Sequence, residues 1–146
     1  MTIKTFRGLL ADGAQERIRL ETLDGKQGYR IKKLVTIPYS PGTTGIESVI
    51  KIYSIKQTTI DVLVNFSEQT LLGVSYYQDD ANIAYPSSQD IIFDRVVFNQ
   101  DIFITLKQNA GSHSMNYYLE LEKIKLDDVE ATAVILKNFR NTNTVA

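Results

Sequence analysis

The sequence predicts an all-β protein, an antiparallel β-sandwich or jelly roll of about eight strands. Apolar residues recur mostly with a period of two, and turn-forming residues interrupt the runs at intervals that suit antiparallel strands. The chain has 146 residues, of which 43% are hydrophobic and 23% charged. Such a chain is expected to bury about two-thirds of its unfolded surface. We therefore expect a single domain spanning residues 1–146.

The N-terminal half is expected to form strands over residues 3–10, 15–23, 28–39, 46–55 and 59–66. Asp24 and Gly25 close the second strand because both tolerate positive φ, and Pro38 ends the third by removing a donor. The fourth strand has apolar residues on both faces, as in a strand that is covered on each side. The fifth is predicted from its β-branched residues. Four apolar residues of the third strand are expected to lie in phase: Tyr29, Ile31, Val35 and Ile37.

The middle of the chain gives a mixed pattern. Residues 68–80 fit either a strand or one short helix, and the period does not separate the two. Residues 81–90 have the composition of a loop, and the β pattern resumes at 91–98 and 101–108.

Residues 101–128 are predicted to form a hairpin around the polar loop NAGSHS. Apolar residues of the return arm are odd-numbered up to Leu121 and then even-numbered at Ile124 and Leu126. An extra residue in a strand turns the following side chains to the other face. We therefore expect a β-bulge or a strand break near Glu122 and Lys123.

The C-terminal segment carries signals of two kinds. Asp127 and Glu130 resemble a capping box, and three apolar residues fall on one helical face: Val129, Ala133 and Leu136. The β-branched residues Thr132, Val134 and Ile135 fit a strand equally well. A short helix is favoured, followed at 141–146 by a loose C-terminal end or an arm for a neighbouring molecule.

Composition excludes several classes of function. Sixteen basic and seventeen acidic residues give a net charge of −1, so we expect neither a nucleic-acid partner nor a membrane partner. The chain has no cysteine, which excludes disulfides, thiolate zinc sites, iron–sulfur clusters and thiol nucleophiles. No apolar run approaches the roughly 20 residues of a membrane span. The N-terminal segment lacks a signal-peptide core, so the protein is expected to stay inside the cell that makes it.

Catalytic chemistry has little support in the sequence. Glu120 and Glu122 share one face of a strand, and paired carboxylates divide acid and base roles in some enzymes. A solvated face balanced by Lys107, Lys123 or Lys125 explains the same pattern. His113, the single histidine, lies in the hairpin loop, and no nucleophile elbow is present. We predict that the protein is not an enzyme and assign no catalytic, cofactor-binding or metal-binding residue.

Two groups of residues remain as binding candidates. Asp79, Asp80 and Asp90 offer oxygen ligands for calcium, but their spacing does not match a twelve-residue calcium loop. Tyrosine suits interfaces because it is large and amphipathic. A tyrosine-rich segment is therefore a candidate contact for a partner protein or a glycan, unless one or two of its members pack inward. Its members are Tyr76, Tyr77 and Tyr85.

Six segments together resemble small proteins of marine tailed bacteriophages, including Pelagibacter phages and cyanophages. They are IKTFRGLLADG, GYRIKKL, ESVIKIYSIKQ, AYPSSQDIIFD, VFNQDIFIT and NYYLELEKIKLDD, and they cover nearly the whole chain. Members of this group are largely uncharacterised or described as virion structural proteins. The resemblance implies a phage particle as the setting, and it brings no catalytic residue to transfer.

The expected function is that of a capsid decoration or cement protein, which binds the head surface and stabilises contacts between capsid subunits. Expected partners are the major capsid protein and copies of this chain, for instance in a trimer. One alternative is a tail or portal-associated ring or fibre component. Another is a carbohydrate-binding module that uses the tyrosines of residues 76–85, and a third is a glycan hydrolase that depends on Glu120 or Asp80.

Overall fold

The computed structural model describes residues 2–22, 25–79 and 87–144. The elements in chain order are β1 (Ile3–Leu10), β2 (Gln15–Ile18), β3 (Gln27–Pro38), β4 (Ile46–Tyr53), β5 (Leu71–Asp79), β6 (Ser87–Ile92), β7 (Ile102–Ala110), β8 (Met115–Lys125) and α1 (Asp128–Thr144).

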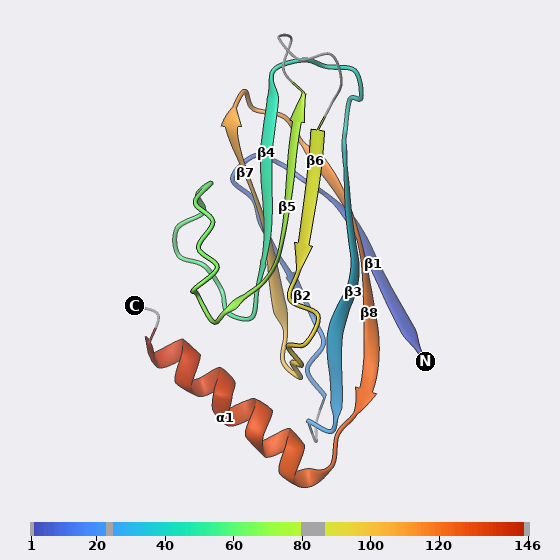
Figure 1. The fold of residues 1–146 in the computed structure, drawn as a ribbon, viewed down its shortest axis with the longest axis vertical. Coiled ribbons are helices and arrows are strands. Elements are labelled where there is room, and N and C mark those ends of the chain that lie inside the picture. Colours follow the sequence, from blue (N-terminus) through green and yellow to red (C-terminus); the bar gives the residue numbers. More distant parts are fainter. Residues whose placement is uncertain (1, 23–24, 80–86, 145–146) are drawn as a thin grey trace.

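The strands form two antiparallel sheets that face each other as a sandwich (Figure 1). One sheet has the order β1-β8-β3 and the other the order β2-β7-β4-β5-β6. Pairing is nested, with β1 beside β8, β2 beside β7 and β4 beside β5. A bridge between Tyr29 of β3 and Phe98, just after β6, adds to this nesting. The predicted all-β sandwich with a C-terminal helix is confirmed.

The core lies between the inner faces of the two sheets. Alternation along each strand turns every second side chain inward, and these positions carry aliphatic residues. In β7, for example, Ile102, Ile104 and Leu106 are fully buried, as the alternating pattern of the sequence predicts. The outer faces therefore decide what the molecule can contact.

A β-bulge lies in β3 and not in β8. The register between these strands shifts between Ile31 and Lys33, so Lys32 is the extra residue. β8 pairs with β1 without interruption as far as Glu122. The predicted bulge near Glu122 and Lys123 was therefore in the wrong strand.

The bulge also separates apolar residues that were expected to lie in phase. Tyr29 and Ile31 are buried before the bulge, and Leu34 is buried after it. Val35 and Ile37 follow in the opposite phase and lie on the outer face, where Ile37 is 55% exposed. The bulge thus leaves Val35 and Ile37 on the outer side, whereas unbroken alternation from Ile31 would have placed them on the core side.

β7 and β8 do not form the predicted hairpin. They are consecutive in the chain, but β7 pairs with β2 and β4, whereas β8 pairs with β1 and β3. The connection at residues 111–114 therefore carries the chain from one sheet to the other. Alternation within each strand was predicted correctly, but it carries no information about which strands pair.

Two other segments differ from expectation. Residues 59–66 are not a strand but part of a long connection between β4 and β5. The segment 81–90 was predicted as a loop, yet residues 87–90 belong to β6, the edge strand beside β5. The ambiguous segment 68–80 contains β5 and no helix in its described part.

The C-terminal segment is helical, as favoured. A carboxylate oxygen of Asp127 accepts the main-chain N–H of Glu130 at 2.7 Å, which is the N-cap half of the predicted capping box. Ala131 is buried against the sandwich, and α1 lies across one end of it (Figure 1). The helix extends through Thr144, into the segment expected to be a loose end.

Candidate functional site

The predicted tyrosine contacts do not come together as one surface. Tyr76 and Tyr77 are neighbours in β5, so their side chains point to opposite faces of the sheet. Tyr77 packs against the core between the sheets, and Tyr76 packs against a smaller cluster on the outer face. Burial raises the pKa of both phenols; a hydrogen bond to Glu47 adds to this effect for Tyr76, and the charge of Asp79 adds to it for Tyr77. Tyr85 lies outside the described residues.

Glu120 and Glu122 lie on the outer face of β8, as predicted, but their partners are not the expected lysines. The guanidinium of Arg30 donates to Glu122 at 2.6 Å, and the Lys32 ammonium lies 3.9 Å from the same carboxylate. The hydrogen bond from Arg30 lowers the pKa of Glu122. Glu120 accepts a hydrogen bond from the hydroxyl of Tyr118 at 2.8 Å. Arg30 and Glu122 thus form an ion pair, and the lowered pKa of Glu122 does not suit a general acid.

The residues considered for metal binding are also dispersed. Asp80 lies outside the described residues, and the carboxylate of Asp90 accepts a hydrogen bond from the hydroxyl of Ser75. Among residues 2–22, 25–79 and 87–144, no three His, Asp or Glu side chains gather as they would around a metal ion.

His113 lies beside a cavity of about 290 Å³ at the end of the sandwich that carries the β3–β4 and β7–β8 connections. The cavity is lined by Pro38, Tyr39, Ser40, Ile46, Ser112, His113 and Ser114. The ring of Tyr39 is 62% exposed. Nothing in the sequence around Tyr39 distinguishes it from the other tyrosines, so alternation and composition do not identify it as a candidate.

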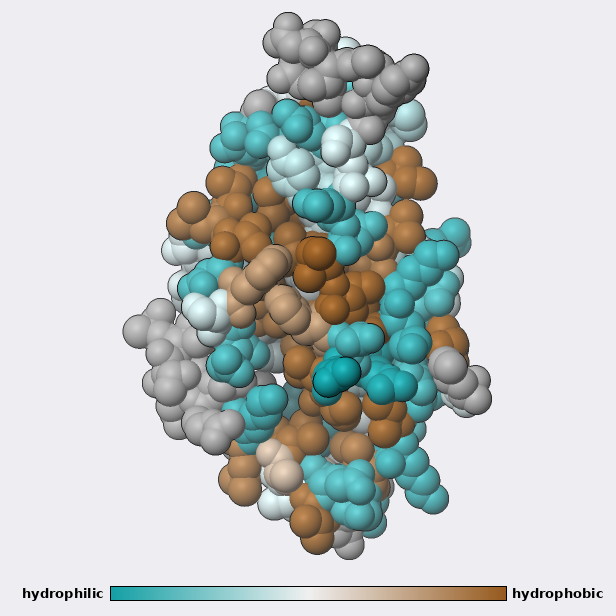
Figure 2. Space-filling model, in the orientation of Figure 1, coloured by the Kyte–Doolittle hydropathy of each residue, from teal (hydrophilic) through white to brown (hydrophobic). Residues whose placement is uncertain are grey.

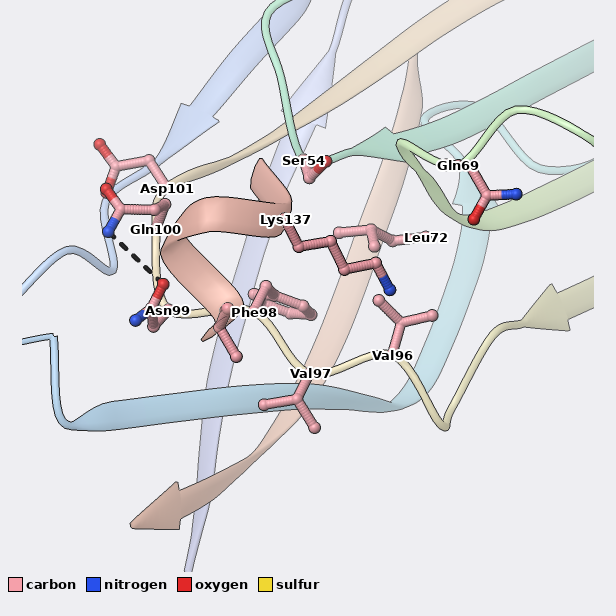
Figure 3. Close-up of a pocket in the computed structure, with 11 residues that line it drawn as sticks. Ser54, Gln69, Leu72, Val96, Val97, Phe98, Asn99, Gln100, Asp101 and Lys137 are labelled. Atoms are coloured by element: carbon pink, nitrogen blue, oxygen red, sulfur yellow. Dashed lines mark hydrogen bonds between the residues drawn. The ribbon is translucent and has the colours of Figure 1, made fainter. Parts of the chain in front are cut away.

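A second cavity lies between α1 and the sandwich (Figure 3). Lys137 extends from α1 across it toward Leu72 and Val96, and the amide of Gln100 donates to Asn99. Its volume is about 30 Å³, which is room for a few water molecules and not for a small-molecule ligand. Asp101 lies at the margin of this cavity, and its carboxylate accepts hydrogen bonds from Arg17 and from the main-chain N–H groups of Leu20 and Glu21. This cavity is a packing feature between helix and sandwich.

The outer face of the β1-β8-β3 sheet carries exposed apolar residues. We call this group the sheet surface: Leu9, Val35, Ile37 and Tyr118. Leu9 is 49% exposed, and a groove of about 440 Å³ runs between these side chains. Val35 and Ile37 reach this surface because of the bulge at Lys32.

A second apolar surface lies on the opposite side of the sandwich, where the connection between β4 and β5 covers the outer face of the five-stranded sheet. We call it the loop surface: Leu63, Val64, Phe66 and Ile91. Figure 2 shows hydrophobic residues gathered across the middle of the face that carries β5, β6 and this connection. Leu63 is 72% exposed and Phe66 is 58% exposed.

A buried lysine fixes the connection that carries the loop surface. Lys51 is 3% exposed, and its ammonium donates to the carboxylate of Asp61 at 3.0 Å and to the carbonyl oxygen of Leu63 at 2.6 Å. The ring of Phe66 packs edge-on against Phe93, with centroids 5.5 Å apart. A lone lysine within the apolar pattern of β4 is the sequence signal that would have identified this anchor.

The helix α1 also exposes apolar residues. Val129 and Leu136 are 79% and 62% exposed, and with Thr132 and Ala133 they line a shallow groove. Within the described part of the chain, no helix has the length and apolarity that a membrane span requires.

Comparisons with family models and with curated proteins identify no relative of the chain. No protein-family model matches the chain, and no curated protein is significantly similar to it.

Proposed function

We propose that the chain is a structural protein of a phage particle, a decoration or cement protein that binds the head and stabilises contacts between capsid subunits. The observation that carries this proposal is the pair of apolar surfaces on opposite sides of one sandwich. A protein that ties two neighbours together needs two separate contact surfaces, whereas a protein that binds one ligand needs only one. The phage-like segments of the sequence supply the setting.

The composition of the two surfaces suits contacts between proteins. Exposed apolar patches mark interaction sites, and aromatic residues are enriched at such interfaces. The sheet surface contains Tyr118 and the loop surface contains Phe66. Each contact can be weak, because a capsid lattice repeats it many times and multivalency raises the total strength of attachment. The proposed partners are the major capsid protein and further copies of this chain, arranged for instance as a trimer on the particle.

The first test is quantitative mass spectrometry of purified particles, which gives the molar ratio of this chain to the major capsid protein. A ratio near one, or a simple fraction of it, is expected for a decoration protein. A ratio of about a few per cent would overturn the head assignment in favour of a tail, portal or fibre component. Absence from particles would overturn the structural role.

The second test places a charge on each of the two apolar surfaces in turn. Leu63→Asp alters the loop surface and Ile37→Asp alters the sheet surface, while Thr58→Asp adds the same charge at another exposed position of the same connection. Binding of added protein to particles that lack it is expected to fall by roughly tenfold or more for each surface variant and to stay unchanged for Thr58→Asp. If only one of the two surface variants lost binding to particles, the bridging role would be contradicted.

A carbohydrate-binding role has one observation in its favour, the exposed ring of Tyr39 beside the cavity at His113. Aromatic rings with hydroxyl groups close by suit sugars, which present an apolar face and a polar rim. Glycan-array binding that is lost in Tyr39→Ala but kept in Tyr77→Phe would support this role. An absence of binding on a broad array would remove it.

A further inference from the structure

The outer edge of β1 is open in the part of the chain that the structure describes. β1 ends the order β1-β8-β3, and Figure 1 shows it at the margin of the molecule. Its register with β8 is continuous over all 8 residues, and it contains neither a proline nor a bulge. The far edge of the same sheet is partly joined to the other layer by the bridge between Tyr29 and Phe98. Proteins usually protect a long, regular edge strand, so an unprotected one indicates a site where another strand pairs.

The main-chain groups that face the open edge can be identified. The N–H of Lys123 donates to the carbonyl oxygen of Thr2 at 2.9 Å, which makes Thr2 and Lys123 a hydrogen-bonded pair. Such pairs alternate along an antiparallel ladder. Even-numbered residues of β1 therefore bond to β8, whereas the N–H and C=O groups of Ile3, Thr5, Arg7 and Leu9 point away from it. This edge offers four donors and four acceptors in regular spacing.

The side chains of β1 give the edge a charge. Residues 2–10 contain Lys4 and Arg7 and no acidic residue. Arg7 is exposed on the outer face, and the Lys4 ammonium lies 5.4 Å from the ring centroid of Phe6. Neither cation forms an ion pair with the described residues. Pairing β1 with β1 of a second copy would bring four cations into one ladder, which disfavours this edge as a contact between copies.

We propose that the free edge of β1 binds an extended acidic segment of a partner protein, which adds to the three-stranded sheet as a fourth, antiparallel strand. The four outward N–H groups and four outward C=O groups hold its main chain, and carboxylates opposite Arg7 and Lys4 set its register. An apolar side chain beyond the carboxylate that faces Arg7 meets Leu9 and continues into the groove of the sheet surface. The inference deepens the proposed function, on which it rests for the setting in a particle.

The test uses an eight-residue peptide written to this register, Thr-Val-Phe-Glu-Val-Thr-Glu-Val, which places one glutamate opposite Arg7 and one opposite Lys4. Binding of a fluorescent form to the full chain is followed by anisotropy. A second peptide carries lysine in place of both glutamates. A third carries N-methyl groups on the fourth and sixth residues, whose N–H groups would donate to β1. Each change is expected to weaken binding by about tenfold or more, since one removes the charge pairs and the other removes two of the four N–H donors of the peptide.

Two protein variants separate the main-chain contact from the charge contact. Thr5→Pro removes an outward N–H without removing a bond to β8, and Thr5→Val is its matched control because it keeps that N–H. Arg7→Glu is expected to weaken binding of the glutamate peptide and to strengthen binding of the lysine peptide. A general loss of folding would weaken binding of both. Thermal denaturation of each variant checks that the sandwich is intact.

Absence of peptide binding would overturn the inference, and so would equal binding of the N-methylated peptide. A preference of Arg7→Glu for the glutamate peptide over the lysine peptide as strong as that of the wild type would overturn the part played by charge. None of these results bears on the proposed function, which the molar ratio in particles tests separately. Conversely, a chain absent from particles that still bound the peptide in this manner would retain the edge site and lose the particle role.

Discussion

The two outer faces of the sandwich are built differently. The face of β4 and β5 is covered by the chain itself, and Val49, Tyr53 and Val74 are buried beneath the connection that follows β4. The outer face of β1, β8 and β3 keeps Leu9, Ile37 and Tyr118 at the surface. The covered face has a lysine anchor that holds its cover, whereas the bare face has an ion pair and an apolar groove.

The difference separates the face that stabilises the fold by burial from the face whose apolar side chains stay exposed. Burial of apolar residues beneath the connection stabilises the fold. On the bare face, Leu9, Ile37 and Tyr118 are exposed to solvent. Substitutions there are therefore expected to alter binding more than folding.

The largest expected difference is between two tyrosines. Tyr53 is 5% exposed on the covered face, and Tyr118 is 36% exposed on the bare face. Tyr53→Ala is expected to lower the free energy of unfolding by about 3 kcal/mol because it leaves a cavity beneath the connection. Tyr118→Ala is expected to cost less than about 1 kcal/mol. Denaturant unfolding of both variants measures the comparison, and similar costs would contradict it.

The lysine anchor is expected to have the next largest effect. Lys51→Met keeps the apolar stem but leaves the carbonyl of Leu63 without the ammonium donor and Asp61 with the N–H of Leu63 instead of both donors, and it is expected to cost about 2 kcal/mol. Hydrogen exchange at residues 54–70 should accelerate more than exchange in β8. Lys56→Met, at an exposed position of the same connection, is the control. Unchanged exchange in Lys51→Met would show that the cover does not depend on this anchor.

A change on the bare face is expected to leave stability almost unaltered. Ile37→Ser is expected to change the free energy of unfolding by no more than about 0.5 kcal/mol, because its side chain lies on the surface. Leu34→Ser, three residues earlier and buried, serves as the contrast. If both variants unfolded alike, the assignment of opposite faces around the bulge would be wrong.

The smallest expected effect concerns the ion pair of Arg30 and Glu122. Because the hydrogen bond from Arg30 lowers the pKa of Glu122, its ionised form stabilises the fold above the pKa of the unfolded chain. This contribution is lost as pH falls through the folded-state pKa. Glu122→Gln should therefore lower Tm slightly at pH 7 and leave it equal to that of the wild type at a pH below the folded-state pKa, with Glu21→Gln as control. A difference in Tm that persists at low pH would contradict the ion-pair explanation.

The sequence predicted the strands whose two faces differ. Leu119 and Leu121 alternate with Glu120 and Glu122, and the structure places the leucines inside and the glutamates outside. The alternation of apolar and polar residues did not predict a strand whose two faces have the same exposure to solvent. The residues of β6 are polar because an edge strand is wet on both faces, so its composition resembled that of a loop.

The candidate surfaces could not be predicted for a related reason. Leu63, Val64 and Phe66 belong to a β-branched, apolar run that would suit a strand, yet this run lies in a connection fixed by Lys51 from another element. Pairing across the sequence also decided the partners of Glu122, because β3 and not β7 lies beside β8. The spacing of residues within a strand predicts which side chains share a face, but it does not predict which distant strand pairs with that strand.

The extra residue in β3 also lets this strand tolerate a change of length. Ile31 pairs with Leu121 and Lys33 pairs with Glu120, so Lys32 has no opposite residue in β8. Loss of the single codon for Lys32 would therefore remove the bulge and leave Leu34, Val35 and Ile37 on the faces that they occupy now. In evolutionary terms, the bare face tolerates a one-residue deletion at this position, and its specificity changes by point substitution.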